Sequence, residues 1–514
     1  MPALLSSLSA LDISLALVGL YVVRKLVTPK PAAPLPPGPS GKPLIGNLLD
    51  MPKEYDYKTF AQWGEQYGGI VSLNILGQSI IILNTTQAVS DMLDKKSSIY
   101  SDRPYLTMAC ELVGLKKLLG LSTYGDRFRE YRRMLFRVMG SKSSMARYQN
   151  VEELETHRFL KRVLANPKDL ENQIRRTAGA IILSIGYGYN IEEKDDHFVH
   201  IAQVMMDDFS KLTEPGAFLV DTIPILRYLP EWFPGAGFHR LAKEYSVNLQ
   251  AVVNEPFNWT KKQIAAGSAK PSFASDQMDE VTSDPTKEEI LKWASAALYA
   301  GGSDTTPSSI YSFYLAMTLH PEIQTKAQAE IDAVVGNERL PTFADRPNLP
   351  YIDAIVKEVA RWNPVAPIGL PHRLKEDDIQ GGYLIPKDSI VIANIWKFLH
   401  DPETYKNPLE FQPERFLKTE THEPETDPYL YAFGFGRRVC PGSLLADASV
   451  FISIVMSLAA FDILKPRDAN GNEITPSGEY ISSTVSHAKH FDCEIKPRSQ
   501  KAAALINAVS LQED

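Results

Sequence analysis

Hydrophobic and polar residues follow several distinct patterns along this chain. Residues Ala3 to Val23 form a nearly unbroken apolar run, about as long as the 20 residues with which a helix spans a bilayer. Residues 70–83, with Gly77-Gln78 at their centre, predict a β-hairpin. A long helix is expected from Thr286 to His320, and residues 444–460 predict a second, apolar helix.

The N-terminal run predicts a membrane anchor. Arg24, Lys25 and Lys30 follow it, and basic residues in that position indicate that the rest of the chain lies in the cytosol. Asp12 and four serines weaken the run, so an anchor lying in the membrane interface stays open. Six prolines then predict an extended spacer. We expect an anchor at residues 1–28, a hinge at residues 29–42 and a globular domain at residues 43–514.

The predicted helix that ends at His320 departs from local rules at its centre. Gly301-Gly302 costs about 1 kcal/mol per glycine in a helix. Pro307 cannot donate the usual helical hydrogen bond, and Asp304-Thr305 lies between these positions. Such departures cluster at functional sites, although a kink that serves packing alone would give the same pattern.

Composition narrows the class of protein. The chain has 514 residues, of which 44% are hydrophobic, which is enough for a large core. Its formal net charge of −8 argues against a general nucleic-acid binder. Three widely spaced cysteines exclude a disulfide scaffold and suit a reducing compartment.

One cysteine, Cys440, lies among glycines and arginines in the stretch Phe433–Gly442. Glycines let a flat ligand approach the backbone, and Arg437 and Arg438 should favour the thiolate over the thiol. A thiolate on haem iron favours O–O cleavage. The alternative interpretation is an ordinary buried cysteine that precedes a helix.

Spacing within this stretch resembles the F-x-x-G-x-R-x-C-x-G signature of the cytochrome P450 superfamily, carried by Phe433, Gly436, Arg438, Cys440 and Gly442. Other motifs of the family also occur in this chain, in the same order along the sequence as in the family. They are residues 301–306, which resemble the oxygen-binding motif A/G-G-x-D/E-T-T/S, the pair Glu358 and Arg361, which resembles E-x-x-R, and Arg415.

The resemblance implies a role for each matching residue. Cys440 would be the iron ligand of haem b, with Phe433, Gly436, Arg438 and Gly442 forming the cofactor loop. Asp304 and Thr305 would deliver protons during catalysis. The remaining roles are haem propionate contacts (Arg132, His372), a buried triad that holds the thiolate loop (Glu358, Arg361, Arg415) and contacts with substrate (Val365, Ala366, Ile368, Leu370). Phe128 stands where the family's W-x-x-x-R motif has tryptophan.

The resemblance also implies a fold and an activity. The fold is mainly α-helical with a small β region, preceded here by the anchor. The activity is that of a microsomal-type fungal monooxygenase, which inserts one oxygen atom from O₂ into a hydrophobic small molecule of secondary metabolism, such as a terpenoid, an aromatic compound or a polyketide. The catalytic domain would face the cytosol at the endoplasmic reticulum membrane.

Electrons are expected from NADPH through a separate reductase, with cytochrome b5 as a second candidate donor, since no G-x-G-x-x-G unit with its strand is present. Arg129, Arg133 and Arg137 share one predicted helix face and could dock an acidic donor, or form an ordinary solvated stripe. Two alternatives remain. A haem-thiolate isomerase or dehydratase often lacks the acid–alcohol pair that Asp304-Thr305 supplies, and a non-catalytic haem-binding protein would need no such pair.

Overall fold

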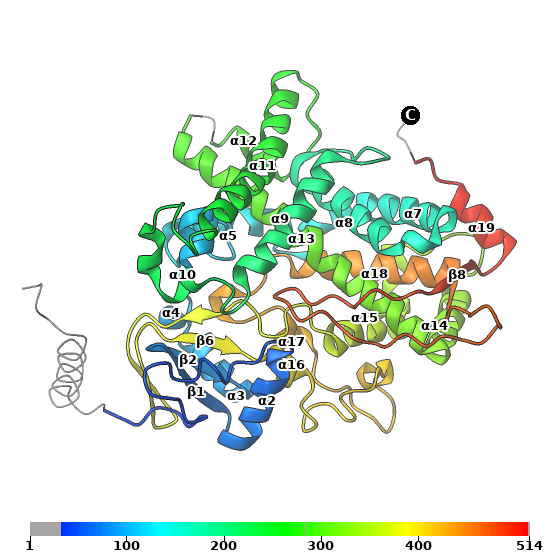
Figure 1. Ribbon diagram of the computed structural model, residues 1–514. Helices are drawn as coiled ribbons and strands as arrows, with labels where there is room; N and C mark the ends of the chain where they lie inside the picture. Colours follow the sequence, from blue (N-terminus) through cyan, green and yellow to red (C-terminus); the bar gives the residue numbers. More distant parts are fainter. Residues whose placement is uncertain (1–31, 282, 512–514) are drawn as a thin grey trace, which may run out of the picture.

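The computed structural model of the protein describes residues 32–281 and 283–511, and it is mainly helical with small sheets (Figure 1). The fold class expected from the sequence is confirmed in this respect. The predicted anchor at residues 1–28 lies outside the described residues. Helices fill the upper and right-hand parts of the view, and the largest sheet lies below them with α2 (Asp56–Tyr67).

The largest sheet has four strands in the order β1-β2-β6-β3. The predicted hairpin is β1 (Ile70–Ile75) paired antiparallel with β2 (Gln78–Leu83), but its turn is one residue earlier than expected, at Leu76-Gly77. Both turn residues have positive φ, which favours glycine at the second position. The later strands are β3 (His372–Arg373) and β6 (Ile390–Ala393), which pairs parallel with β2.

Helix α13 (Pro285–Leu319) crosses the molecule as one element of 35 residues. It begins one residue before the predicted start, because Asp284 caps it by accepting hydrogen bonds from the amides of Thr286 and Lys287. It continues through Gly301-Gly302 and Pro307 without a break. The two glycines and the proline therefore do not end the helix, and another reason is needed for their presence at its centre.

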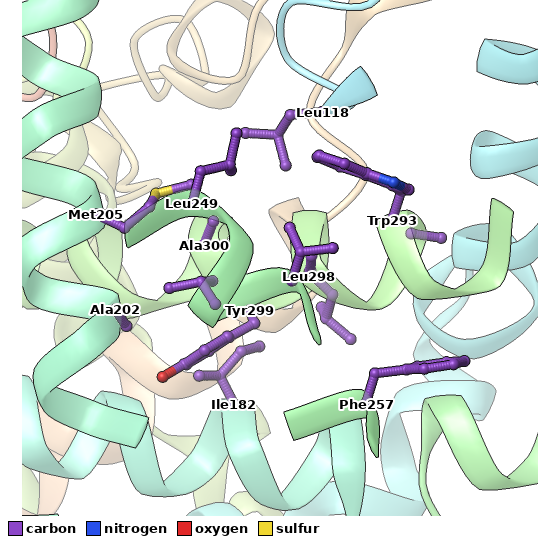
Figure 2. Close-up of a cluster of buried hydrophobic side chains, with 14 of the residues drawn as sticks. Leu118, Ile182, Ala202, Met205, Leu249, Phe257, Trp293, Leu298, Tyr299 and Ala300 are labelled. Atoms are coloured by element: carbon purple, nitrogen blue, oxygen red, sulfur yellow. The ribbon is translucent and has the colours of Figure 1, made fainter. Parts of the chain in front are cut away.

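Two large hydrophobic clusters meet along α13. Residues 291–300 belong to a cluster with α5 (Asp126–Met139), α8 (Leu170–Tyr187) and α11 (Phe238–Ala265), part of which Figure 2 shows around Leu298 and Tyr299. Residues 310–317 belong to a second cluster with α7 (Gln149–Ala165), α14 (Pro321–Val334), α15 (Pro350–Trp362) and α18 (Ser443–Ala460). The segment 301–308 lies between the two clusters.

The remaining helices and strands complete these layers. They are α3 (Thr86–Val89), α4 (Ser97–Tyr100), α6 (Lys142–Met145), α9 (His197–Thr213), α10 (Leu219–Thr222), α12 (Phe273–Met278), α16 (Ile395–Leu399), α17 (Tyr429–Ala432), α19 (Gln500–Asn507), β4 (Asp378–Gln380), β5 (Tyr383–Ile385), β7 (Phe461–Leu464) and β8 (Glu494–Pro497). Among the described residues, α18 alone is long and apolar enough to cross a membrane, but it packs inside the protein as a core helix.

Candidate functional site

The loop before α18 holds Cys440 in a fixed turn. The Cys440 amide donates to the carbonyl of Phe433 over 2.8 Å. Gly436 has a φ of 54°, and a Cβ added there would lie 2.1 Å from the carbonyl oxygen of Leu93, so no other residue fits without moving the backbone. The Gly436 amide also donates to Asp94 over 2.7 Å. The glycine of the motif is thus required by close packing of this loop on residues 90–95.

The Cys440 side chain is accessible although it lies deep in the molecule, so it faces an internal hollow. Burial raises the pKa of its thiol, and the Gly442 amide and Arg132 oppose that rise. The sequence led us to expect that Arg437 and Arg438 favour the thiolate, and this expectation was wrong. Arg437 instead donates to the Tyr124 hydroxyl, and Arg438 to the carbonyls of Ser101 and Ser122.

Basic side chains gather beside this loop in the interior. Arg438 is buried with its guanidinium 4.0 Å from the centre of the Phe128 ring, which stands where the family motif has tryptophan. Arg132, on the same helix as Phe128, donates to the carbonyl of Val439. Arg103 is also buried and donates to the carbonyls of Leu370, Pro371 and Gly120.

This cluster carries more positive charge than its surroundings offset. Burial and the neighbouring Arg132 lower the pKa of Arg438 to about 10, against the opposing effect of Asp102. Burial and the charge on Arg438 also lower the pKa of Arg103. Asp102, the carboxylate whose charge acts on these arginines, already forms an ion pair with Arg373 at 2.8 Å. Burying several cations this way is costly unless an anion joins them. The two carboxylates of a haem fit this requirement.

His372 lies next to the same arginines, and its Nδ1 is 2.8 Å from the carbonyl oxygen of Tyr100. Burial, together with the charge on Arg103, holds the pKa of His372 well below its usual value. A neutral ring that donates from Nδ1 has only an acceptor at Nε2. His372 could therefore donate to a propionate only if that anion favours protonation of the ring.

The centre of α13 presents two different faces. Gly301 is exposed, and a Cβ added there would meet none of the described atoms within 4 Å, so this position borders open space. A Cβ on Gly302 would lie 2.9 Å from the Ile182 side chain, so this glycine allows α8 to pack closely. The Thr305 hydroxyl donates to the carbonyl of Gly301 over 2.6 Å.

Asp304 points to other partners. Its Oδ1 lies 2.5 Å from an Arg175 nitrogen and 3.1 Å from Nε2 of His487. The contact with Arg175 is a hydrogen bond, and the contact with His487 is an ion pair. Burial raises the pKa of the Asp304 carboxyl, but His487 and Arg175 together outweigh burial and bring it below its usual value. Asp304 is thus held as a carboxylate.

The predicted triad forms in the second cluster. Both oxygens of Glu358 accept from Arg361, over 2.7 and 2.8 Å, and Arg415 donates to Glu358 over 3.2 Å. All three side chains are buried. Arg361 also donates to the carbonyls of Leu399, Pro408 and Glu410, so the triad ties α15 to the long segment that precedes the Cys440 loop.

The predicted substrate contacts divide into two groups. Val365 and Leu370 pack at the edge of the first hydrophobic cluster, which also includes Ala300 and Leu445. Ile368 instead packs against the sheet, among Val71, Leu73 and Ile82. Ala366 is partly buried.

The sequence pattern of the cytochrome P450 family matches residues 36–490 of this chain. The chain belongs to the cytochrome P450 family. It is 51% identical to cytochrome P450 monooxygenase 208 of Postia placenta over 93% of both chains. It is 47% identical to cytochrome P450 monooxygenase claR of Ampulloclitocybe clavipes over 97% of this chain and 91% of that protein. It is 41% identical to ppsD of Aspergillus oryzae over 93% of this chain and 92% of that protein.

As a cytochrome P450, the protein is a monooxygenase that binds haem b through a cysteine thiolate and takes electrons from a reductase. The residues around Cys440 fit this cofactor. The sulfur faces a hollow, Gly301 leaves open space, and buried arginines need anions. A bound iron also removes the thiol proton that burial would otherwise retain.

Three side chains of this P450 were missed by the sequence analysis: Arg103, Arg175 and His487. Arg103 precedes Pro104 in a stretch that matches none of the motifs described above. Arg175 lies 129 residues before Asp304, inside a helix that has several other charges. Nothing local distinguishes these residues, because their importance comes from partners that are distant in the sequence.

Proposed function

We propose that this P450 oxidises hydrophobic small molecules of fungal secondary metabolism, such as terpenoids, aromatic compounds or polyketides. The observation that carries the proposal is the position of the Cys440 sulfur. It faces a hollow next to the hydrophobic cluster that includes Ala300 from α13 and Leu445 from α18. An apolar substrate would gain free energy by leaving water for such a place. ClaR and ppsD are monooxygenases by name, which agrees with this class of reaction.

A thiolate-bound haem supplies the chemistry by which one atom of O₂ enters a substrate and the other leaves as water. In our proposal, Cys440 holds the iron, and Phe433, Gly436 and Gly442 shape its loop. Arg103, Arg132 and Arg438, with His372, hold the propionates, and the triad of Glu358, Arg361 and Arg415 fixes the segment before the loop. Thr305 hands protons into the hollow, and Asp304 resupplies them. Val365 and Leu370 contact the substrate.

Membrane association is also part of the proposal. Fungal members of the family are typically associated with the endoplasmic reticulum. The chain between α9 and α11 exposes large apolar side chains, with Trp232 81% and Ile225 72% accessible. This surface would lie against lipid beside the predicted anchor, with the catalytic domain in the cytosol. The donor would be NADPH–cytochrome P450 reductase, with cytochrome b5 as a second candidate.

In our proposal, the donor docks on the helix face that carries Arg129, Arg133 and Arg137. Each contacts a carboxylate of this chain, namely Asp126, Glu130 and Glu280. All three pairs are solvent-exposed and therefore weak. Acidic side chains of the donor could therefore replace these partners at a small cost in free energy.

The test is turnover of a compound panel by the haem-loaded protein with reductase and NADPH, using isotopically labelled O₂ and mass spectrometry. We expect one labelled oxygen atom in the product. Isomerised or dehydrated products without label would support the isomerase or dehydratase alternative. An absence of any product, with normal haem content, would favour a non-catalytic haem-binding protein.

A first prediction concerns Thr305→Ala in the same assay. If the hydroxyl hands on protons, the variant should keep its haem and consume NADPH, but product formed per NADPH should fall by about 10²-fold or more. Released hydrogen peroxide should account for the difference. Cys440→Ser is the control, because it should lose the red-shifted Soret band of the reduced carbon monoxide complex altogether. An unchanged product-to-NADPH ratio in Thr305→Ala would remove this role.

A further inference from the structure

Charged side chains from three elements surround Asp304. Arg175 comes from α8, where it also contacts Glu171 at 3.4 Å. His487 comes from the chain before β8 and lies 3.1 Å from the Asp304 carboxylate. Asp207, on α9, is close enough for the charges of Arg175, Asp304, Lys211 and His487 to act on it. This group of residues connects α13 to the C-terminal part of the chain.

His487 is fixed in position by its own segment. The Ser308 hydroxyl donates to the carbonyl of Ser486 over 2.5 Å, and the Ser486 amide donates to the carbonyl of Val365 over 2.8 Å. Ser308 is four residues after Asp304, so both lie on one face of α13. The His487 side chain is 12% accessible, which leaves the ring at the edge of the protein interior. The backbone beside His487 is therefore held against α13, and the ring lies within contact distance of Asp304.

The two cations on Asp304 differ in one chemical respect. An arginine does not release its proton in proteins, and the neighbouring carboxylates raise the pKa of Arg175 further, despite its burial. An imidazolium can release a proton near neutral pH. Since Asp304 is itself held as a carboxylate, it has no proton of its own to pass on. A donor is needed, and His487 is the side chain in contact that can act as one.

A small cavity lies on the same side of α13. Its volume is about 10 Å³, and its lining includes Arg175, Gln203, Ser303 and Asp304. That is about the volume that one water molecule needs, and four polar side chains are enough to bind it. A water molecule at this place would lie against Asp304 and Arg175 and could exchange a proton with the carboxylate.

We propose that His487 supplies the proton that Asp304 delivers in each turnover. The imidazolium gives its Nε2 proton to Oδ1 of Asp304, leaving a neutral ring and a neutral carboxyl group. The carboxyl passes the proton toward Thr305 and becomes a carboxylate again, stabilised by Arg175. The ring then takes a proton from solvent, so one proton enters for each one delivered. The inference rests on the proposed relay of Asp304 and Thr305, and it makes His487 a positioning and proton-supplying residue.

The test compares His487→Gln with His487→Arg. Both remove the transferable proton, but arginine keeps the positive charge beside Asp304. We expect product per NADPH to fall at least tenfold in both variants, with haem content unchanged. Both variants leave Arg175 and Asp207, the other charged groups beside Asp304, in place.

Two controls separate this role from a structural one. His490→Gln changes an exposed histidine three residues further on, which lies 3.8 Å from Asp492, and should match the wild type. Hydrogen peroxide supplies oxygen, electrons and protons together, so peroxide-driven product formation should be equal in wild type and both His487 variants. Rescue by His487→Arg with NADPH would mean that His487 acts only through its charge, and would overturn the inference.

A measurement without turnover tests the contact itself. In protein labelled with ¹⁵N-histidine, the ring signals of His487, assigned by their loss in His487→Gln, should shift in Asp304→Asn and in Arg175→Lys. Unchanged signals would overturn the inference, whether or not product forms. If wild type made no product with either NADPH or peroxide, the proposed function would fail, whereas His487 variants that match an active wild type would refute only the inference.

Discussion

Glu152 is a carboxyl group that the proposed chemistry does not use. It lies fully buried on α7, where its Oε1 accepts from the Ser449 hydroxyl of α18 over 2.7 Å. Its Oε2 has no hydrogen-bond partner among residues 32–281 and 283–511. Burial raises the pKa of Glu152 to about 8, and Asp447 and Glu153 add to this rise against the effect of Ser449. The folded protein therefore keeps this group protonated at neutral pH.

This pKa predicts a pH dependence of stability. In the unfolded chain the Glu152 carboxyl has its ordinary pKa of about 4.3, so between that value and about pH 8 the folded state binds the extra proton. Stability should therefore fall as the pH rises through this window and stay level above it, with a total change of at most about 5 kcal/mol. Glu152→Gln should remove this part of the dependence.

Thermal unfolding of the haem-loaded protein between pH 5 and pH 9 measures the effect. The unfolding temperature of Glu152→Gln should rise relative to that of the wild type as the pH rises. Glu65→Gln, on an exposed position of α2, is the control and should follow wild type at each pH. Parallel curves for wild type and Glu152→Gln would contradict the raised pKa.

At the scale of elements, α15 and the Cys440 loop depend on the buried triad. Glu358→Gln would leave Arg361 and Arg415 buried without their shared carboxylate, although Arg415 keeps Glu425 at 2.6 Å. Breaking a buried ion pair in this way costs about 3–5 kcal/mol. We expect low haem content and a lowered unfolding temperature in Glu358→Gln.

Lys357→Gln is the matched control for the triad. Lys357 is the preceding residue of α15 and makes a partly exposed ion pair with Asp427 at 2.7 Å. Such pairs contribute about 0–1 kcal/mol, so the control should keep its haem and its stability. Equal losses in both variants would mean that the triad has no special role.

The elements also show what the sequence could predict. The hairpin, α13 and α18 follow from local periodicity, and the Cys440 loop from local glycine spacing. Gly301 and Gly302 looked equivalent in the sequence, but one borders open space and the other admits α8, a difference set by Ile182 from another helix. Arg103, Arg175 and His487 could not be found for the same reason, because local sequence does not record long-range contacts.

At the scale of the whole molecule, apolar side chains are exposed between α9 and α11. Ile225→Ser with Trp232→Ser should weaken binding of the haem-loaded chain to phospholipid vesicles, since burying such side chains is worth about 1.5–3 kcal/mol each. We expect at least a tenfold loss in a form that lacks residues 1–28, and a smaller loss in the full chain, which keeps the predicted anchor. Vesicle co-sedimentation measures both.

Leu409→Ser is the control for this surface. Leu409 is 72% exposed, like Ile225, but lies in the segment bound by the triad. Its substitution should leave vesicle binding unchanged. Equal weakening by Leu409→Ser would show that general hydrophobicity, and not this surface, determines the binding.

The Cys440 loop has a consequence for how the protein is made. Arg438 binds the carbonyl of Ser101, which is 337 residues earlier in the chain. A ribosome that adds roughly 5–20 residues per second needs on the order of 20–70 s to cover that distance. During this time the parts of the site that are made first, including Arg103 and Arg132, remain solvent-exposed because the Cys440 loop has not yet been synthesised. Haem can therefore bind in the completed site only at the last stage of synthesis or later, once the segments around Ser101 and Arg438 have both been made.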